Sequence, residues 1–437
     1  MTDPAMSVAP YWELTFDADG DPDGPERDRL LADLPGSGVR DLIVFAHGWN
    51  NDRSEATRLY SRFFAPVPGL APAARIGYVG VVWPSMRFCD EPIPDFPRSA
   101  AGPAPGPALD EDTRRALLDT FPGRAAVVDR LARMLDQRPR EGTALEEFGR
   151  LVRLLAEAAP PGPQALFAAD TVARGVPRGE PGMFTRPTAD VCAEFAAAAA
   201  RLEAPAGPET FSLPDPWDGA KELLRQATYY AMKRRAGTVG ERGLGPAVGR
   251  LAHTAPGVRV HLVGHSFGGR LVSFALRGLP ARVRSVKSVT LLQGAFSHYA
   301  FAPRLPDDPG AGGVLCGQED RVDGPLVCCH SRFDSALGTF YPLAARMADD
   351  DRSVLGVDIG GLLGPEWGAM GHDGVQGVPG TRAYALAAAL SAPLPVSGCV
   401  NVDAAEVIRR GGPPAGAHSD IVHPELARVV LAAGRIR

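Results

Sequence analysis

The chain has 437 residues, of which 45% are hydrophobic and 22% are charged, and its formal net charge is −5. Such a chain can build one large domain or two of ordinary size, and without a basic excess it is not expected to bind nucleic acid. No run of about 18 apolar residues occurs, which argues against a transmembrane helix. The N-terminus also lacks the basic start and apolar stretch of a signal peptide. We therefore expect a cytoplasmic protein, with export by another route left open.

The cysteines show neither a CxxC pair nor the spacing of a zinc site. We expect structural thiols, with no disulfide framework, metal or organic cofactor. The six are Cys89, Cys192, Cys316, Cys328, Cys329 and Cys399.

Short, β-branched apolar segments recur along the chain and predict strands. Near-continuous apolar runs of this length are typical of strands that are buried on both faces, as in a parallel sheet. The segments are 11–16, 40–48, 75–84, 258–266, 286–295, 324–334 and 397–405. Helical patterns lie between most of them, among them 55–64 with Asp52 or Ser54 as its cap, 218–237 ending at Gly237, and 424–436. This alternation predicts a doubly wound α/β domain with a mostly parallel sheet.

One connection, from residue 84 to residue 258, is far longer than an ordinary crossover between strands. Helical patterns and Pro/Gly-rich pieces fill it. We expect 90–210 to be a helical insertion that forms a lid or cap, with 1–89 and 211–437 as the core domain. A scaffold extension with no role at the site is the alternative. The helical patterns are 112–136, 142–159 and 189–203, and Gly/Pro/Asp-rich surface loops are expected at 301–323 and 347–380.

The sequence LVGHSFGG places Ser266 between an apolar strand and an amphipathic helix. A serine on a tight strand-to-helix turn has a strained backbone, and its hydroxyl is pushed out at the edge of the sheet. Side chains two residues before and two after would collide with neighbouring backbone, so Gly264 and Gly268 suit these positions. The helix that follows directs its N-terminal N–H groups at the site, which favours a developing anion. Ser266 is therefore the candidate nucleophile.

In this context the chain resembles the α/β-hydrolase superfamily of serine hydrolases. FAHGWNND, with VVWPS downstream, is similar to bacterial esterase/lipase-type members, and HSRFDSALGTFYPLA and GAHSDI are similar to the acid and histidine loops of a bacterial lipase group. Two departures are that this chain has D-S-A-L-G and lacks the glycine run that often follows HSD in that group. The resemblance covers roughly 40–95 and 215–435, so the 90–210 insertion, which we expect to set the substrate, lies mostly outside it.

The resemblance implies an acid after the second strand that follows the nucleophile, and then a histidine on a late loop. Asp334 occupies the acid position, where a carboxylate would orient the histidine, and Asp403 after the last strand is its main rival. His418 is the candidate base. His423 beside Pro424 is the alternative and is expected to pack or cap there.

The resemblance also implies an oxyanion hole made of two main-chain N–H groups. One is that of Phe267, directly after the nucleophile, and the other is that of Trp49 in the HGWNN loop. Trp49 is also expected to line the acyl pocket, unless it only packs against the lid. His265 is expected to pack beneath the turn and His261 lies inside a strand. His330 and His372 are expected to be structural or to lie at the surface.

The resulting hypothesis is a serine hydrolase that cleaves carboxylic esters through an acyl-enzyme. The substrate is a small-molecule or lipid ester, and peripheral contact with lipid is left open. An acyltransferase, thioesterase or amidase with the same triad is the alternative, and a non-catalytic interaction protein of this fold is a third. The oligomeric state is left unassigned.

Overall fold

The structure is a computed structural model, and it describes most of the chain outside several connecting segments. The described residues are 6–49, 51–86, 107–156, 162–173, 176–177, 182–203, 215–306, 308–334, 368–411 and 416–437.

The centre of the structure is a parallel sheet of eight strands in the order β1-β3-β2-β6-β7-β9-β11-β10. This confirms the α/β class and all seven predicted strands. The eighth strand, β10, was missed because it is a short edge strand whose Arg-Ala-Tyr-Ala residues are mostly exposed. The strands are β1 Tyr11–Thr15, β2 Asp41–Ala46, β3 Ile76–Val82, β6 Arg259–His265, β7 Val286–Leu292, β9 Pro325–His330, β10 Arg382–Ala385 and β11 Gly398–Asp403.

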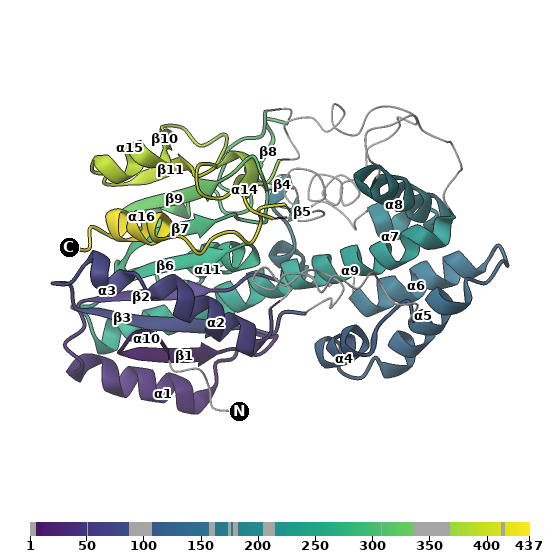
Figure 1. Ribbon diagram of the computed structural model, residues 1–437, viewed down its shortest axis with the longest axis horizontal. Helices are drawn as coiled ribbons and strands as arrows, with labels where there is room; N and C mark the ends of the chain where they lie inside the picture. The colour runs from purple at the N-terminus through teal and green to yellow at the C-terminus, as the bar shows by residue number, and fades with distance from the viewer. Residues whose placement is uncertain are drawn as a thin grey trace.

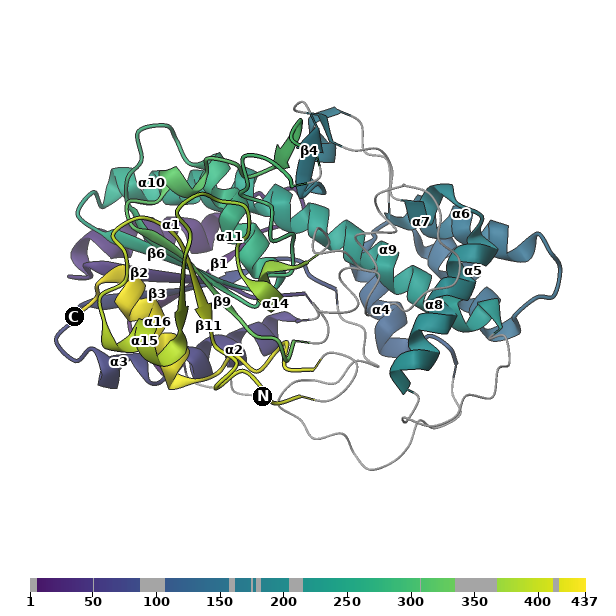
Figure 2. The same ribbon diagram turned by 90° about the horizontal axis from the view of Figure 1, so that it is seen from above.

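Helices cover both faces of the sheet (Figures 1 and 2). Successive residues of a strand point to opposite faces, and in β2 Leu42 and Val44 pack into one core while Ile43 and Phe45 pack into the other. The first face carries α1 Gly24–Asp33, α10 Gly245–Thr254 and α11 Phe267–Gly278, and the second carries α2 Arg53–Phe64, α3 Val67–Leu70, α15 Leu386–Ser391 and α16 Pro424–Gly434.

The chain leaves the centre of the sheet in two directions. From β2 it moves outward to β3, and from β6 it moves the opposite way to β7 and then β9. The two inner strands β2 and β6 are neighbours in parallel register. Open α/β sheets bind ligands at such a reversal, beyond the carboxyl ends of the strands. The residues that follow Ala46 and His265 are therefore placed at this edge.

The predicted cap of α2 resolves to Asp52 rather than Ser54. The Asp52 carboxylate accepts from the Glu55 N–H at 2.8 Å, and the Glu55 carboxylate accepts from the Asp52 N–H at 3.1 Å. This reciprocal capping box satisfies N–H groups that the helix itself cannot pair.

The described part of 107–203, between β3 and β6, is largely helical, and its helices α4 to α8 lie to one side of the sheet (Figure 1). The predicted helix over 112–136 is in fact two helices, because Pro122-Gly123 interrupts it. The helices are α4 Glu111–Thr120, α5 Ala125–Gln137, α6 Ala144–Ala156, a 3₁₀ turn Gly162–Phe167, α7 Gly182–Thr185 and α8 Thr188–Glu203.

Helix α9, Pro216–Thr238, joins this helical region to the sheet layers. At its start, the Trp217 indole N–H donates to the Pro139 carbonyl at 3.2 Å, and its ring packs on Phe148. The chain does not leave the helix at Gly237, as was expected, but continues through a π-helix, Val239–Leu244, into α10. A Cβ at Gly237 would lie 2.5 Å from the Phe167 carbonyl oxygen, so this glycine permits close packing rather than ending a helix.

The two regions share one hydrophobic core. Phe148 and Cys192 of the helical region belong to the same buried cluster as Leu42 of the sheet. The expected division at 210–211 therefore precedes a helix, α9, that packs in both regions.

The expected surface loop over 301–323 is partly wrong. Its strand β8, Ala311–Gly313, pairs with β4, Thr171–Ala173, which also pairs with β5, Val176–Pro177. Phe301 and Leu315 are fully buried and belong to the hydrophobic core on the first face of the sheet. Of the other expected loop, 347–367 lies outside the described residues, and 368–380 contains α14, Met370–Asp373, with Met370 buried.

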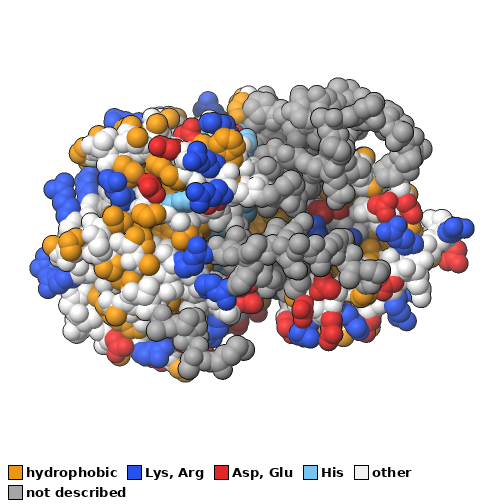
Figure 3. All heavy atoms as spheres, in the orientation of Figure 1, with side chains coloured by type: hydrophobic (Ala, Val, Ile, Leu, Met, Phe, Trp, Pro, Cys, Tyr) orange, Lys and Arg blue, Asp and Glu red, His pale blue; other side chains and the backbone are white. Residues whose placement is uncertain are grey.

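Within the described part of the chain, no helix is both long and apolar enough to cross a bilayer, and no three metal-ligating side chains form a group. The five described cysteines are free, with Cys328 and Cys329 buried in β9, whereas Cys89 lies outside the described residues. On the face drawn in Figure 3, acidic and basic side chains are interspersed over the described helices of the 107–203 region.

Candidate active site

Ser266 occupies a sharp turn between β6 and α11. Its backbone has φ 56° and ψ −121°, a conformation that is costly for a residue with a side chain. A Cβ at Gly264 would lie 2.3 Å from the Gly268 carbonyl oxygen, and a Cβ at Gly268 would lie 1.9 Å from the Ala46 carbonyl oxygen. Both glycines are therefore required by close backbone packing. The turn places the Ser266 hydroxyl at the carboxyl edge of the sheet, where the chain reverses direction.

His418 lies between Ser266 and Asp334 in a continuous chain of hydrogen bonds. The Nε2 atom of His418 is 2.9 Å from the Ser266 Oγ, and its Nδ1 is 2.7 Å from Oδ2 of Asp334. Because a carboxylate only accepts, Nδ1 carries the proton and Nε2 is free to accept from the hydroxyl. The Asp334 side chain is 0% exposed, whereas that of His418 is 16% exposed.

The loops that carry the acid and the histidine are tied to each other. The Ala417 N–H donates to the Phe333 carbonyl at 2.9 Å, and the Asp334 N–H donates to the Ser331 carbonyl at 3.1 Å. The Ser331 hydroxyl in turn donates to the Ile408 carbonyl at 2.6 Å. These main-chain contacts bring together residues that lie 84 positions apart in the sequence.

The two rivals from the sequence have other partners. Asp403, at the end of β11, accepts from the Ala405 N–H at 2.9 Å. His423 is at the N-terminus of α16, and its Nε2 is 2.8 Å from Asp420. The other carboxylate oxygen of Asp420 accepts from the N–H groups of Arg409 and Arg410. The Asp420 carboxylate therefore connects the loop that carries His418 to Arg409, Arg410 and His423 by hydrogen bonds.

His265 supports His418 from below. Its Nε2–H donates to the His418 carbonyl at 2.9 Å, and its ring lies 5.1 Å from the His418 ring. Burial lowers the pKa of His265 to about 3, so the ring is neutral near pH 7. The sequence predicted a packed residue here. The structure adds a hydrogen bond to the main chain of the candidate base.

The loop after β2 lies directly against Ser266. A Cβ at Gly48 would be 2.7 Å from the Cβ of Ser266. The buried His47 fixes this loop, because its Nδ1 donates to the Gly48 carbonyl at 2.8 Å and its own carbonyl accepts from the Trp83 indole N–H at 2.9 Å. Burial lowers the pKa of His47 to about 4. The hydrogen bonds of His47 thus hold this loop in place against Ser266.

Three aromatic rings gather beside the turn. Tyr229 of α9 lies 4.5 Å from Phe267 and 5.5 Å from Trp49, measured between ring centroids. Trp49 and Phe267 are 6.5 Å apart. Trp49 therefore packs against α9, and Phe267 is the first residue of α11. Both residues whose N–H groups were predicted to hold an oxyanion meet at Tyr229.

Gln293 was not singled out from the sequence. It follows β7, the neighbour of the strand β6 that ends one residue before Ser266, and it has a positive φ of 49°. Its side chain is fully buried, and neither polar atom of its amide has a hydrogen-bond partner. The signal was a polar residue at the carboxyl end of a central apolar strand, in TLLQGA.

A second missed group anchors the helical region to α11. The Arg270 side chain is 0% exposed and forms an ion pair with Asp170. Its Nη2 also donates to the carbonyls of Phe167 and Ala169 at 2.8 and 2.7 Å. Lys233 of α9 contacts the same carboxylate at 2.7 Å. A charged residue one helical turn after Ser266 was the available signal in the sequence.

Two other histidines, His330 and His298, form contacts outside the group of Ser266, His418 and Asp334. His330, at the end of β9, lies 3.3 Å from the His372 carbonyl and lines a cavity of about 620 Å³ together with Asp373 and Asp403. His298 is buried and its Nδ1 is 2.7 Å from Asp373.

Comparison with protein-family models, with curated proteins and with solved structures finds no match to this chain. The chemistry of the site is therefore inferred from its residues and their geometry.

Proposed function

We propose that this protein is a serine hydrolase with an α/β-hydrolase fold that cleaves carboxylic esters. The observation that carries the proposal is the unbroken hydrogen-bond chain from Ser266 through His418 to the buried Asp334. The three side chains come from three loops at one sheet edge, and the nucleophile sits in a strained turn whose position only close glycine packing permits. Nucleophile, base and orienting acid in this order are the parts that acyl transfer requires.

In the proposed mechanism the Ser266 oxygen attacks the ester carbonyl while His418 Nε2 takes the hydroxyl proton. His418 then gives this proton to the leaving alcohol, which leaves an acyl group on Ser266. Water attacks the acyl group, again with His418 as the base, and releases the acid. Asp334 stabilises the protonated imidazole and keeps Nε2 directed at Ser266.

The proposed oxyanion hole consists of the N–H groups of Phe267 and Trp49. Phe267 begins α11, so its N–H has no partner within the helix and adds to the positive end of the helix dipole. The closeness of Gly48 to the Ser266 Cβ supports the contribution of the loop that carries Trp49. Such preorganised donors stabilise the charge that develops on the carbonyl oxygen.

We further propose that the helical region between β3 and β6 acts as a lid that shapes the acyl pocket. Its link to the site is α9, because Tyr229 touches the rings of both Trp49 and Phe267. An apolar aromatic lining of this kind favours esters with an apolar acyl part. This supports bulky or lipid-like esters over small polar ones.

A fluorophosphonate probe, which labels activated serines, tests the proposal. The native chain should be labelled, and Ser266→Ala should not. Ser273→Ala is the matched control, because Ser273 lies on the same helix and its hydroxyl only donates to the Gly269 carbonyl at 2.8 Å. An unlabelled native chain, under conditions that label a control esterase, would favour a non-catalytic role.

A substrate panel then defines the bond that is cleaved. p-Nitrophenyl esters of increasing chain length, phospholipids and a polyester film should be compared, with Ser266→Ala as the blank. Labelling without hydrolysis of any ester would favour an amide or thioester substrate. Faster release of p-nitrophenol with an added alcohol would favour acyl transfer.

A further inference from the structure

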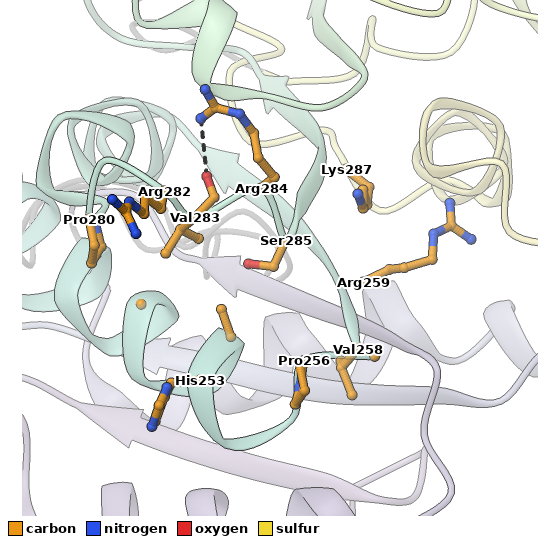
Figure 4. A pocket seen from close by; sticks show the side chains of 13 residues that line it. His253, Pro256, Val258, Arg259, Pro280, Arg282, Val283, Arg284, Ser285 and Lys287 are labelled. Atoms are coloured by element: carbon orange, nitrogen blue, oxygen red, sulfur yellow. Dashed lines mark hydrogen bonds between the residues drawn. The ribbon is translucent and has the colours of Figure 1, made fainter.

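A cavity of about 730 Å³ lies at the opposite edge of the sheet from Ser266. It opens between the connection from α10 to β6 and the connection from α11 to β7. Figure 4 shows Arg282, Val283 and Arg284 on one side and His253 and Pro256 on the other, with Ser285 between them. The full length of β6, about 20 Å at the usual rise per residue, separates this cavity from the nucleophile.

The cavity is strongly basic. Arg259, Arg282, Arg284 and Lys287 line it, and none of its lining residues, all of which are described, is acidic. Carboxylates outside the cavity pair with Arg259, at 3.0 Å from Asp41, and with Lys287.

Arg282 and Arg284 have no such partner. Among the described residues neither forms an ion pair, and Arg284 donates only to the neighbouring Val283 carbonyl at 3.2 Å. Neither guanidinium is therefore paired directly with a carboxylate, although the charge of Arg284 acts on the nearby Asp323, whose pKa is lowered by Lys287 and further by Arg284.

The end of α11 does not explain these two charges. Helix C-termini attract cations, but the effect is confined to the last turn, and α11 ends at Gly278. Arg321 already supplies a cation directly after this helix, because it donates to the carbonyls of Leu279 and Pro280 at 3.0 and 2.9 Å. Burial lowers the pKa of Arg321, and the positive charge of Arg284 lowers it further. Arg284 and Arg321 therefore repel each other at this edge.

Ser285 adds a second and independent observation. Its hydroxyl oxygen is buried in the lining and has no hydrogen-bond partner. A buried hydroxyl without a partner costs free energy that a bound acceptor would recover.

We propose that this cavity binds a phosphate group. A phosphate monoester carries a charge between about −1.5 and −2 near pH 7, which suits two guanidinium groups that form no ion pair with the protein. Arginine binds phosphate through two parallel N–H bonds, and the Ser285 hydroxyl supplies a further donor. The site is separate from the ester site and does not depend on the proposed catalytic function.

Isothermal titration calorimetry with inorganic phosphate, at constant ionic strength, tests the free ligand. Sedimentation with phosphatidic acid vesicles, against phosphatidylcholine vesicles, tests a lipid-borne phosphate monoester. The native full-length chain is compared with Arg282→Gln/Arg284→Gln and with Ser285→Ala. The matched control is Arg133→Gln/Arg428→Gln, which removes the same charge from exposed positions on α5 and α16.

We expect one phosphate to bind per chain. The double variant in the cavity should lower the affinity at least about tenfold, because charge-assisted bonds are lost, and Ser285→Ala should lower it about threefold. The control should bind like the native chain. Binding to phosphatidic acid vesicles alone, if it requires Arg282 and Arg284, would support a lipid-borne phosphate. No binding in either assay, or equal binding by the double variant in the cavity, would overturn the proposal.

Discussion

His265 packs beneath the turn that carries Ser266, and it also helps to orient His418, the candidate base. Its Nε2–H holds the His418 carbonyl, while Nδ1 is buried without a partner. The proposed mechanism needs a neutral ring in this place, because a second positive charge beside His418 would oppose its protonation. Burial provides the neutral state by lowering the pKa of His265 to about 3.

Replacing His265 tests this positioning role. His265→Leu fills the space but leaves the His418 carbonyl unpaired, so we expect kcat for a p-nitrophenyl ester to fall about tenfold with little change in KM. His265→Gln retains an N–H donor and should recover part of the loss. If the leucine variant has native kcat, His265 only fills space.

Gln293 is a residue that weakens the fold at the edge of the site. Its buried amide has no hydrogen-bond partner, and its backbone is in the left-handed region. We expect Gln293→Met to raise the free energy of unfolding by about 1–2 kcal/mol, because an apolar side chain of similar size removes the unpaired amide. Urea unfolding measures this change.

The control for this variant is Gln376→Met. The amide of Gln376 donates to the Asp373 carbonyl at 2.8 Å, so its loss should lower stability or leave it unchanged. A stability loss in Gln293→Met equal to that of the control would show that the Gln293 amide is satisfied.

At the scale of elements, the helical region is held to α11 by a buried ion pair rather than by apolar contacts alone. Arg270 of α11 and Lys233 of α9 converge on Asp170, which also accepts from the Ser297 N–H at 3.1 Å. Three segments that are distant in the sequence thus meet at the Asp170 carboxylate, next to α11. A buried pair of this kind adds little net stability but is costly to break.

Asp170→Asn should therefore lower the free energy of unfolding by about 3–5 kcal/mol, because it leaves a buried guanidinium without its counter-charge. Adding Arg270→Met should restore part of the loss. Asp129→Asn, which breaks an exposed pair with Arg114, should cost less than about 1 kcal/mol. Urea unfolding compares the three variants. Equal effects of Asp170→Asn and Asp129→Asn would contradict the anchoring role.

At the scale of the whole molecule, two buried histidines make stability depend on acid. Burial lowers the pKa of His47 to about 4 and that of His265 to about 3, whereas an unfolded histidine has a pKa near 6.5. Below about pH 6.5 the unfolded state binds protons that the folded state does not. The stability is therefore fully present above this pH and is lost as the pH falls toward the folded-state values.

We expect the free energy of unfolding to fall by about 2 kcal/mol for each of these histidines between pH 7.5 and pH 5.0. Urea titrations at the two pH values measure it. Equal stability at both pH values would contradict the assignment of neutral, buried rings to His47 and His265.

Much of the fold follows from local sequence patterns. Seven strands of the central sheet were predicted because a strand buried on both faces needs a run of apolar side chains, and such a run is visible in the sequence. The short exposed strand β10 and the strand β8 have no such run, and they form only because a neighbouring strand offers its backbone groups. Gly237 shows the same limit, since the sequence does not distinguish a glycine that ends a helix from one that lets Phe167 approach.

By itself the sequence determined which residue types could serve as nucleophile, base and acid, and in what order along the chain. Only the tertiary structure decided that His418, rather than His423, forms a hydrogen bond with Ser266. It also decided that Asp334, rather than Asp403, forms a hydrogen bond with His418. The physical reason is that hydrogen bonds require contact within about 3 Å. Residues 84 and 152 positions apart in the sequence reach that distance only through the order of strands in the sheet and the main-chain bonds between their loops.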